Sequence, residues 1–416
     1  MALACGLDFG TSNSTVGCVR PDQSALLPLE DGKVTLPSVV FFNADEDAVY
    51  YGRAALSNYL AGYEGRLMRS LKSLLGTSLI DGQTEVHGRA LPYRGLLAQF
   101  IGELKRRAEQ AAGHQLSSAV IGRPVFFIDD DAVADRLAET TLEEVARAAG
   151  FKDIAFQFEP IAAAFDYESQ IDHEELVLIA DIGGGTSDFS LVRLSPERAL
   201  KSDRRDDILA TGGVHVGGTD FDKYLSLASV MPLLGMGSRM KNNTEVPSSY
   251  YFNLATWHTI NQVYTQKTWV QLKDVYRDVC EKDKLDRLMS LIEQRAGHWL
   301  AMKVEEAKIA LSESPQIDLH LERLLSSQTL AIKREDFDTA IARMVTNVEA
   351  TVAGVLRDAG VAASAVDTVF FTGGSSGVQS LRERIGALLP SARRVEGDLF
   401  GSIGAGLALD AQRKFG

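Results

Sequence analysis

The sequence has few cysteines, little basic charge and no long apolar run, and each shortage excludes a class of protein. Three cysteines among 416 residues are too few for the disulfide framework of a secreted protein. The 43 basic and 56 acidic residues give a net charge of −13, which disfavours binding to nucleic acid or to an anionic membrane. No apolar run approaches the length of a membrane span. The start of the chain lacks the basic segment of a signal peptide, so we expect a cytoplasmic protein.

What the sequence does have is enough apolar residues for a large core and an excess of glycine. Apolar residues make up 45% of the chain and charged residues 24%, which favours two to four folded domains at about 100–200 residues each. There is no low-complexity tract and no linker rich in proline or serine. Many of the 36 glycines cluster in short loops after apolar runs. The strongest of these runs, 176–180 and 125–128, are predicted to be buried strands.

A hairpin pattern occurs twice. Strands predicted at 3–7 and 15–20 flank a turn at 8–14, and strands at 176–180 and 189–194 flank a turn at 181–188. Both turns begin with aspartate, an apolar residue and glycine, and their aspartates lie about 173 residues apart. The spacing predicts two related halves rather than a solenoid.

A second repeated pattern supports this division. A strand at 119–121 ends in Gly122-Arg123-Pro124 and precedes a helix near 132–149, whereas a strand at 369–371 ends in a glycine loop and precedes a helix through 389. Both halves therefore predict mixed sheets flanked by helices. Residues 37–111, with a helix at 96–112, and residues 226–312, largely helical after 269, interrupt the two halves. Each insertion is long enough for a small subdomain.

The glycine loops suggest phosphate binding. Residues 183–186 follow a strand and Asp181, so unhindered backbone N–H groups can converge on an anion. A tight turn is the plain alternative for one glycine triplet. A similar loop begins at Asp8, and this second occurrence favours two facing phosphate loops, with Mg²⁺ needed to relieve repulsion between the aspartates and a polyphosphate. The Gly-Lys-Ser/Thr phosphate motif and the Gly-x-Gly-x-x-Gly fingerprint are both absent.

Two helices carry further candidates. Glu159 follows the strand at 154–158, and Pro160 suits the first turn of a helix, so the carboxylate should project from the end of the sheet. The alternative is a glutamate that merely suits the helix dipole. In a helix at 299–312, Glu305, Lys308 and Ser312 share one stripe, which is a solvated face unless the glycine loops converge on it. His215 has no partner at metal-ligand spacing and is interpreted as structural.

Together these segments resemble the ATPase portion of DnaK-type chaperones of the heat shock protein 70 family, including the shorter YegD-like proteins. Residues 7–14 and 180–188 resemble the two phosphate loops, and 159–164 resemble the connecting motif. The family's other motifs are matched, in order, by the catalytic-lysine segment 72–76, the loop 217–222, the adenosine helix 305–312 and the adenosine loop 372–376. The matches extend over nearly the whole chain.

The resemblance implies an α/β actin-like fold, in which duplicated ribonuclease-H-like domains form two lobes around a nucleotide cleft. Lobe I would be residues 1–172, with a core at 1–36 and 112–172 and an outer subdomain at 37–111. Lobe II would be residues 173–416, with a core at 173–225 and 313–399 and an outer subdomain at 226–312. A terminal helix at 402–413 would pack back on lobe I.

The resemblance also implies a set of site residues and cofactors. ATP or ADP, Mg²⁺ and K⁺ are the implied cofactors, with Asp8, Asp181 and Glu159 holding the metal through water. The implied catalytic residues are Lys72, Glu159, Asp8, Asp181 and Thr186. Nucleotide binding is implied for Gly10, Thr11, Ser12, Asn13, Gly183, Gly184, Gly185, Thr186, Gly217, Gly218, Glu305, Lys308, Ser312, Gly373, Gly374, Ser375 and Asp398. Pro124 matches the family proline associated with relaying the nucleotide state.

The sequence departs from the family at three places. Gly377 stands where the family usually has an arginine that stacks on adenine, which should weaken base binding by about 1 kcal/mol. Residues 226–300 match the family poorly, and a β-rich peptide-binding domain is not expected in a chain that ends at residue 416.

Four functions remain open at this stage. The first is a slow chaperone-like ATPase, with nucleotide and an unidentified client or co-chaperone as its partners. The second is a nucleotide-dependent binding module with little turnover. An actin-like filament protein and a sugar or acetate kinase share the duplicated fold. Sedimentation with ATP would indicate filaments, and phosphorylation of small hydroxylated compounds would indicate a kinase.

Overall fold

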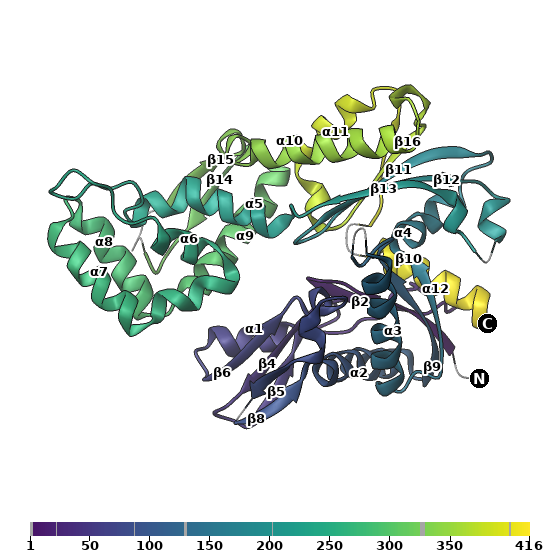
Figure 1. Ribbon diagram of the computed structural model, residues 1–416, viewed down its shortest axis with the longest axis horizontal. Coiled ribbons are helices and arrows are strands. Elements are labelled where there is room, and N and C mark those ends of the chain that lie inside the picture. The colour runs from purple at the N-terminus through teal and green to yellow at the C-terminus, as the bar shows by residue number, and fades with distance from the viewer. Residues whose placement is uncertain are drawn as a thin grey trace. The chain divides into compact units, whose positions relative to one another are not determined.

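The computed structural model describes residues 3–21, 23–86, 88–128, 131–201, 203–324, 329–398 and 401–416 (Figure 1). The chain forms two compact units. Unit 1 comprises Met1–Gly213, Thr351–Ser376 and Gly386–Gly416, and unit 2 comprises Val214–Ala350 and Gly377–Ile385. The two lobes at 1–172 and 173–416 stay a prediction.

Unit 1 contains a five-stranded mixed sheet built from the first repeat. The strand order is β10-β9-β1-β2-β3. β1 pairs with β2 in antiparallel fashion and with β9 in parallel, and β9 and β10 are also parallel. The bounds are β1 Leu3–Phe9, β2 Asn13–Gly17, β3 Thr35–Pro37, β9 Leu116–Arg123 and β10 Asp153–Phe158.

The second sheet repeats this arrangement. Its order is β13-β12-β11-β16-β17, with β11 antiparallel to β12 and parallel to β16, which is parallel to β17. The bounds are β11 Glu175–Ile182, β12 Ser187–Leu194, β13 Ile208–Val214, β16 Thr368–Thr372 and β17 Arg393–Glu396. The predicted duplication is therefore confirmed, because β11, β12 and β16 take the places that β1, β2 and β9 hold in the first sheet.

Both hairpin turns are shorter than the sequence predicted. The antiparallel pairing continues to Phe9 opposite Ser14 and to Ile182 opposite Ser187. Only four residues, 10–13 or 183–186, lie between each pair. The second turn is closed by a hydrogen bond from the Gly183 N–H to the Thr186 carbonyl, 2.9 Å long. Consequently Asp8 and Asp181 lie within strands, where the pairing fixes their direction, rather than in the turns.

Four helices of unit 1 pack close to its two main sheets, and the short helix that begins at Glu159 is one of them. Leu96, Leu97, Phe100 and Leu104 of α2 (Tyr93–Ala112) belong to one buried cluster with Leu7 and Phe9 of β1. Alternate residues of a strand face one side, so the apolar residues of β1 point to α2 while Asp8 does not. The other three of these four helices are α3 (Ala132–Ala148), α4 (Glu159–Glu168) and α12 (Ser402–Phe415).

The apolar run at 125–128 is not a strand, so that prediction was wrong. The segment is irregular, and the Phe126 side chain is 53% exposed. Side chains take the backbone hydrogen bonds that a sheet would have used. The Arg123 guanidinium donates to the Val125 carbonyl, 3.2 Å away, and the Asp135 carboxylate accepts from the Phe127 N–H, 2.6 Å away.

The insertion at 37–111 contains a small sheet of its own. Its strands are β4 (Val39–Asn43), β5 (Ala48–Tyr51) and β6 (Gly65–Arg69), in the order β5-β4-β6. A separate hairpin is formed by β7 (Gln83–Val86) and β8 (Arg89–Pro92), and α1 spans Gly52–Leu60. Between β6 and β7 the chain makes two 3₁₀ turns, Leu71–Leu74 and Ser78–Asp81, and the first of them carries Lys72.

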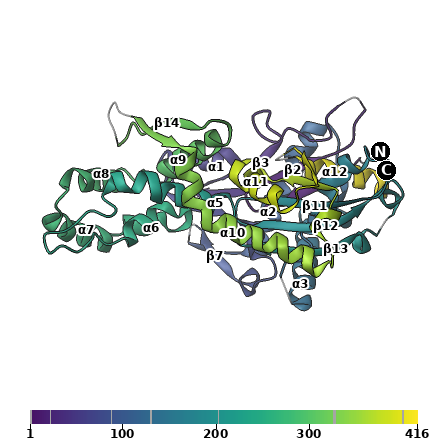
Figure 2. The same cartoon turned by 90° about the horizontal axis from the view of Figure 1, so that it is seen from above.

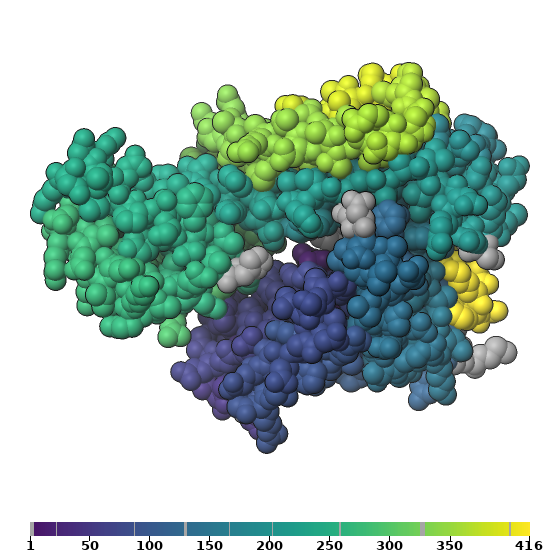
Figure 3. Space-filling model, in the orientation of Figure 1, coloured from purple at the N-terminus to yellow at the C-terminus, as the bar shows by residue number. Residues whose placement is uncertain are grey.

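Unit 2 is mainly helical, and its helices start earlier than the expected residue 269. Figure 2 shows α6, α7 and α8 at one end of this unit, and they form the green surface at the left of Figure 3. The helices are α5 (Gly218–Leu225), α6 (Ser249–Ala255), α7 (Gln266–Asp278), α8 (Lys282–Glu293), α9 (Gly297–Glu313), α10 (Arg334–Asp358, which extends into unit 1) and α11 (Gln379–Leu388). A hairpin of β14 (Gln316–His320) and β15 (Thr329–Lys333) follows α9. In the described part of the chain, no helix is long and apolar enough to cross a membrane.

Candidate functional site

Three glycine loops of unit 1 meet around Asp181. A Cβ at Gly184 would overlap the Ser12 side chain, so the two hairpin turns lie against each other. Gly373, in the loop after β16, has a φ of +81°, and a Cβ there would lie 2.5 Å from an oxygen of the Asp181 carboxylate. Glycine is required at Gly373, because φ is positive and a Cβ would also lie 2.5 Å from the Ile182 carbonyl oxygen, whereas a Cβ at Gly184 would force the Ser12 side chain to move.

An ion pair lies beside these loops. The Lys72 Nζ is 2.6 Å from the Glu159 Oε1, and each side chain is only 12% exposed. Glu159 is the first residue of α4, directly after β10, as the sequence predicted from Pro160. A Cβ at Gly122, at the end of β9, would lie 3.2 Å from the Glu159 Cγ, so the glycine leaves room for this side chain.

The charges of the site perturb one another. Burial, and then the charge of Glu159, raises the pKa of Asp8 to about 7, although Lys72 acts in the opposite direction. Burial, followed by Asp188, Glu159 and Asp8, raises the pKa of Asp181 to about 8. Burial alone would lower the pKa of Lys72, but Glu159 and Asp8 raise it above its ordinary value. The site therefore gathers four carboxylates around one ammonium group and suits an additional cation.

The carboxylates are spread too far apart to hold a metal ion by themselves. Among the described residues, no group of three or more histidine, cysteine, aspartate or glutamate side chains could hold a metal directly. A divalent cation at this site would need water or phosphate oxygens for much of its coordination. Mg²⁺ commonly binds in this manner, through one or two carboxylates, several waters and substrate phosphates.

Sequence reasoning missed two residues that shape the site. The Ser38 Oγ donates to the Gly10 carbonyl, 2.7 Å away, and the Ser38 N–H donates to the Ser12 carbonyl, 2.9 Å away, so Ser38 holds the first loop. Asp188 lies opposite Asp181 in the β11–β12 pair, and its carboxylate accepts from the Thr186 Oγ1, 2.9 Å away. Period-two alternation along the second hairpin could have indicated Asp188, but nothing local indicated Ser38.

The predicted adenosine residues are divided between the units. Gly373, Gly374, Ser375 and Asp398 belong to unit 1, whereas Gly217, Gly218, Glu305, Lys308 and Ser312 belong to unit 2. A base site formed by both groups therefore stays a prediction, as do the roles of all the predicted site residues.

The three predicted adenosine residues of α9 in unit 2 differ in exposure and in hydrogen bonding. Lys308 is buried, and its Nζ lies 2.9 Å from an Asp222 carboxylate oxygen and 3.3 Å from the Gly218 carbonyl. This pairing links α9 to α5. Glu305 is exposed, and the Ser312 Oγ donates to the Lys308 carbonyl, 3.4 Å away. Gly377 ends a 3₁₀ turn at Gly374–Gly377 and contributes no side chain.

Comparison with known proteins identifies the family. The family model described as "Hsp70 protein" matches residues 4–96, 83–230 and 275–409. The chain belongs to the Hsp70 family, and its α/β fold is the actin-like fold expected from the sequence. The family model does not match residues 231–274. These residues lie within the stretch 226–300, which the sequence analysis found to match the family poorly.

Individual relatives are bacterial chaperones. The chain is 30% identical to "Chaperone protein HscA homolog" of Shewanella putrefaciens over 434 residues. It is 29% identical to "Chaperone protein HscA" of Citrobacter koseri over 432 residues, and of Escherichia coli over 435 residues. Each comparison covers 98% of this chain and 58% of the relative. The chain thus spans about 58% of the length of these relatives.

Proposed function

We propose that this chain binds ATP with Mg²⁺ and hydrolyses it slowly, as the nucleotide-dependent part of a chaperone-like activity. The observation that carries the proposal is the Lys72–Glu159 ion pair, 2.6 Å long, set beside the partly buried carboxylates of Asp8 and Asp181 where the glycine loops meet. Membership of the Hsp70 family supports the same reaction.

Each residue of the site would have its own role in ATP hydrolysis. Backbone amides of the turns at 10–13 and 183–186 would bind phosphate oxygens, since the glycines carry no Cβ atoms to hinder them. The Gly183 N–H is the exception, because it already donates to the Thr186 carbonyl. Lys72 would balance charge on the γ-phosphate and orient the attacking water. Glu159 would accept a hydrogen bond from that water, and the Thr186 hydroxyl would contact phosphate. Phosphoryl transfer depends on such positioning and charge neutralisation, so no covalent nucleophile is required.

The carboxylates fit a hydrated Mg²⁺ ion. Asp8, Asp181 and Glu159 would hold it through water, because burial already makes the negative forms of Asp8 and Asp181 costly. When bound, the ion would neutralise charge on the β- and γ-phosphates. A bound K⁺ ion would act in the same way.

The adenosine contacts are proposed for Glu305, Lys308 and Ser312 on one side and Gly373, Gly374, Ser375 and Asp398 on the other. Gly217 and Gly218 would complete the nucleotide contacts. A nucleotide module with little turnover is the second candidate, and Gly377 favours it because the base lacks a stacking cation there. Client and co-chaperone partners are proposed only by likeness to the relatives.

Variants of the ion pair test the proposal. Lys72→Ala and Glu159→Gln should each lower Mg²⁺-dependent phosphate release by about 100-fold or more, with nucleotide affinity changed far less. Lys105→Ala is the matched control, because Lys105 forms a comparable partly buried pair with Glu109, 2.6 Å away on α2. Tight binding without turnover in the wild type would favour the second candidate, and equal rates in Lys72→Ala and wild type would refute the assigned roles.

A further inference from the structure

Helix α4 connects the proposed catalytic carboxylate to a second cluster of buried charges. Glu159 is its first residue and Glu168 is its last. Ten residues at 1.5 Å each make a rod of about 15 Å. Its middle residues, Ile161 to Phe165, are at most 3% exposed. Whatever fixes Glu168 can therefore influence where Glu159 lies.

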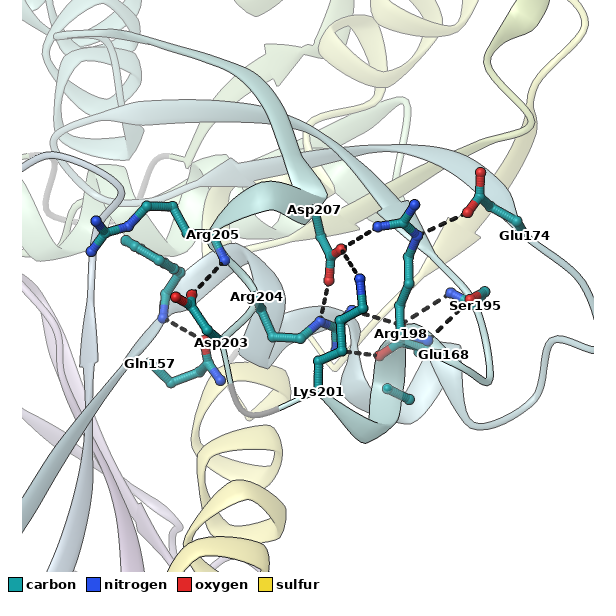
Figure 4. Close-up of polar contacts among 12 residues, drawn as sticks. Gln157, Glu168, Glu174, Ser195, Arg198, Lys201, Asp203, Arg204, Arg205 and Asp207 are labelled. Atoms are coloured by element: carbon teal, nitrogen blue, oxygen red, sulfur yellow. Dashed lines mark hydrogen bonds and ion pairs between the residues drawn. The ribbon is translucent and has the colours of Figure 1, made fainter.

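The cluster at the far end is centred on Arg204, whose side chain is fully buried (Figure 4). Its Nη1 and Nη2 donate to the two Glu168 carboxylate oxygens over 2.9 and 2.7 Å, and its Nε donates to Asp207. The Ser195 N–H also donates to Glu168, over 3.2 Å. A two-pronged guanidinium–carboxylate contact fixes orientation as well as distance, so it opposes rotation and sliding of α4.

Other contacts hold α4 in different directions. A Cβ at Gly406 of α12 would overlap the Ala162 carbonyl, so the two helices approach backbone to backbone. This contact sets how far α4 lies from α12 but leaves rotation about the helix axis less restricted. At the site end, α4 has no side-chain cap hydrogen bond at Phe158. In the last turn, Tyr167 is also held, because its hydroxyl lies 2.9 Å from the Thr368 Oγ1 and accepts from the Arg393 guanidinium over 2.8 Å. Of the polar contacts described for this turn, the one between Arg204 and Glu168 is the two-pronged one.

We propose that Arg204 is a positioning residue for Glu159, acting through Glu168 and the rigid body of α4. By holding the last turn of the helix, Arg204 keeps the Glu159 carboxylate in register with the Lys72 ammonium. The inference rests on the proposed function for its effect on turnover, but its effect on the Lys72–Glu159 contact can be measured without any nucleotide.

Two variants separate positioning from general stability. Arg204→Lys keeps the buried positive charge but loses the two-pronged contact with Glu168. Arg198→Met is the matched control. Arg198 also binds Asp207 and reaches Glu174 over 2.8 Å, so its removal disturbs the same loop without removing a contact to α4 (Figure 4).

The first readout is the rate at which Lys72 is acetylated in nucleotide-free protein at one fixed pH, followed by mass spectrometry. Arg204→Lys should raise this rate about twofold or more, because a displaced Glu159 exposes the lysine. The second readout is turnover, for which kcat should fall about threefold to tenfold while nucleotide Kd stays within about twofold. Arg198→Met should leave both readouts at wild-type values even where its melting temperature falls.

Two results would overturn the inference. One is wild-type Lys72 acetylation in Arg204→Lys, and the other is an equal change in Arg204→Lys and Arg198→Met at matched stability. A wild-type protein that hydrolyses no ATP would refute the proposed function instead, and the acetylation rates would still decide whether Arg204 positions Glu159.

Discussion

Lys72 and Glu159 decide how much negative charge the site tolerates. Their contact is short and largely shielded from water, so their attraction is stronger than that of a surface pair. One ammonium group does not balance the carboxylates of Asp8, Asp181, Asp188 and Glu159, and the raised pKa values of Asp8 and Asp181 record the remaining repulsion. In the nucleotide-free site, Asp8 and Asp181 therefore keep their protons to a higher pH than aspartates in an unfolded chain do.

This retention predicts how stability depends on pH. The folded-state pKa values of Asp8 and Asp181, about 7 and about 8, lie above their ordinary value of 3.8. The folded protein therefore binds more protons than the unfolded chain between about pH 4 and pH 8, and its stability should fall as pH rises through that window. Asp181 alone should contribute about 1.4 kcal/mol per pH unit. Denaturant unfolding of nucleotide-free protein without Mg²⁺ at pH 6 and pH 8.5 measures this difference.

Asp181→Asn provides the control, because an amide cannot titrate. The pH dependence should flatten in this variant, and it should weaken in Asp188→Asn, which removes the strongest charge acting on Asp181. The interpretation would be contradicted if wild-type protein gained stability from pH 6 to pH 8.5, or if Asp181→Asn kept the full wild-type slope.

Among elements, the contact between α4 and α12 depends on glycine. In Gly406→Ala the new methyl group would lie 1.9 Å from the Ala162 carbonyl oxygen, which is a steric clash. Overpacking of this kind should lower the free energy of unfolding by about 1–3 kcal/mol. Thermal or denaturant unfolding measures the loss, and turnover should fall as well because α4 carries Glu159.

Gly102→Ala is the helical control. The nearest atom to a Cβ at Gly102 is the Ala149 Cβ at 4.0 Å, an ordinary contact, so alanine should stabilise α2 by about 0.5–1 kcal/mol through helix propensity. If Gly406→Ala and Gly102→Ala changed the free energy of unfolding equally, the close approach of α12 to α4 would not be what requires glycine at position 406.

Local patterns predicted the elements well where the chain's own neighbours decide the structure. The corner at Glu159, the two hairpins and the helix expected near 132–149, which the structure has at 132–148, follow from proline position, glycine turns and apolar spacing. The terminal helix expected at 402–413, observed at 402–415, was predicted only from the family resemblance. The irregular segment at 125–128 was mispredicted because Arg123 and Asp135 take its backbone hydrogen bonds. Ser38, 28 residues from Gly10, and Arg204, 36 residues from Glu168, could not be predicted from local sequence at all.

Across the whole molecule, duplication explains how a chain with net charge −13 could form the proposed phosphate site. Two copies of one sheet bring two glycine turns and two strand aspartates together within unit 1, and Lys72 is supplied by the insertion in the first half. Unit 2 is mainly helical, and it contains residues 231–274, which lie outside the family match. The proposed phosphate-binding residues thus lie mainly in the repeated core, whereas the residues that depart from the family lie in unit 2.

Single-turnover hydrolysis tests the central claim most directly. Protein in excess of ATP, with Mg²⁺ present, is quenched at intervals, and the ratio of ADP to ATP is measured for wild type, Lys72→Ala and the Lys105→Ala control. We predict that wild type and Lys105→Ala convert bound ATP at the same rate, that Lys72→Ala binds ATP but converts it at least about 100-fold more slowly, and that a chelator stops conversion. Bound ATP that remains intact on wild-type protein, or equal conversion by Lys72→Ala, would contradict the account.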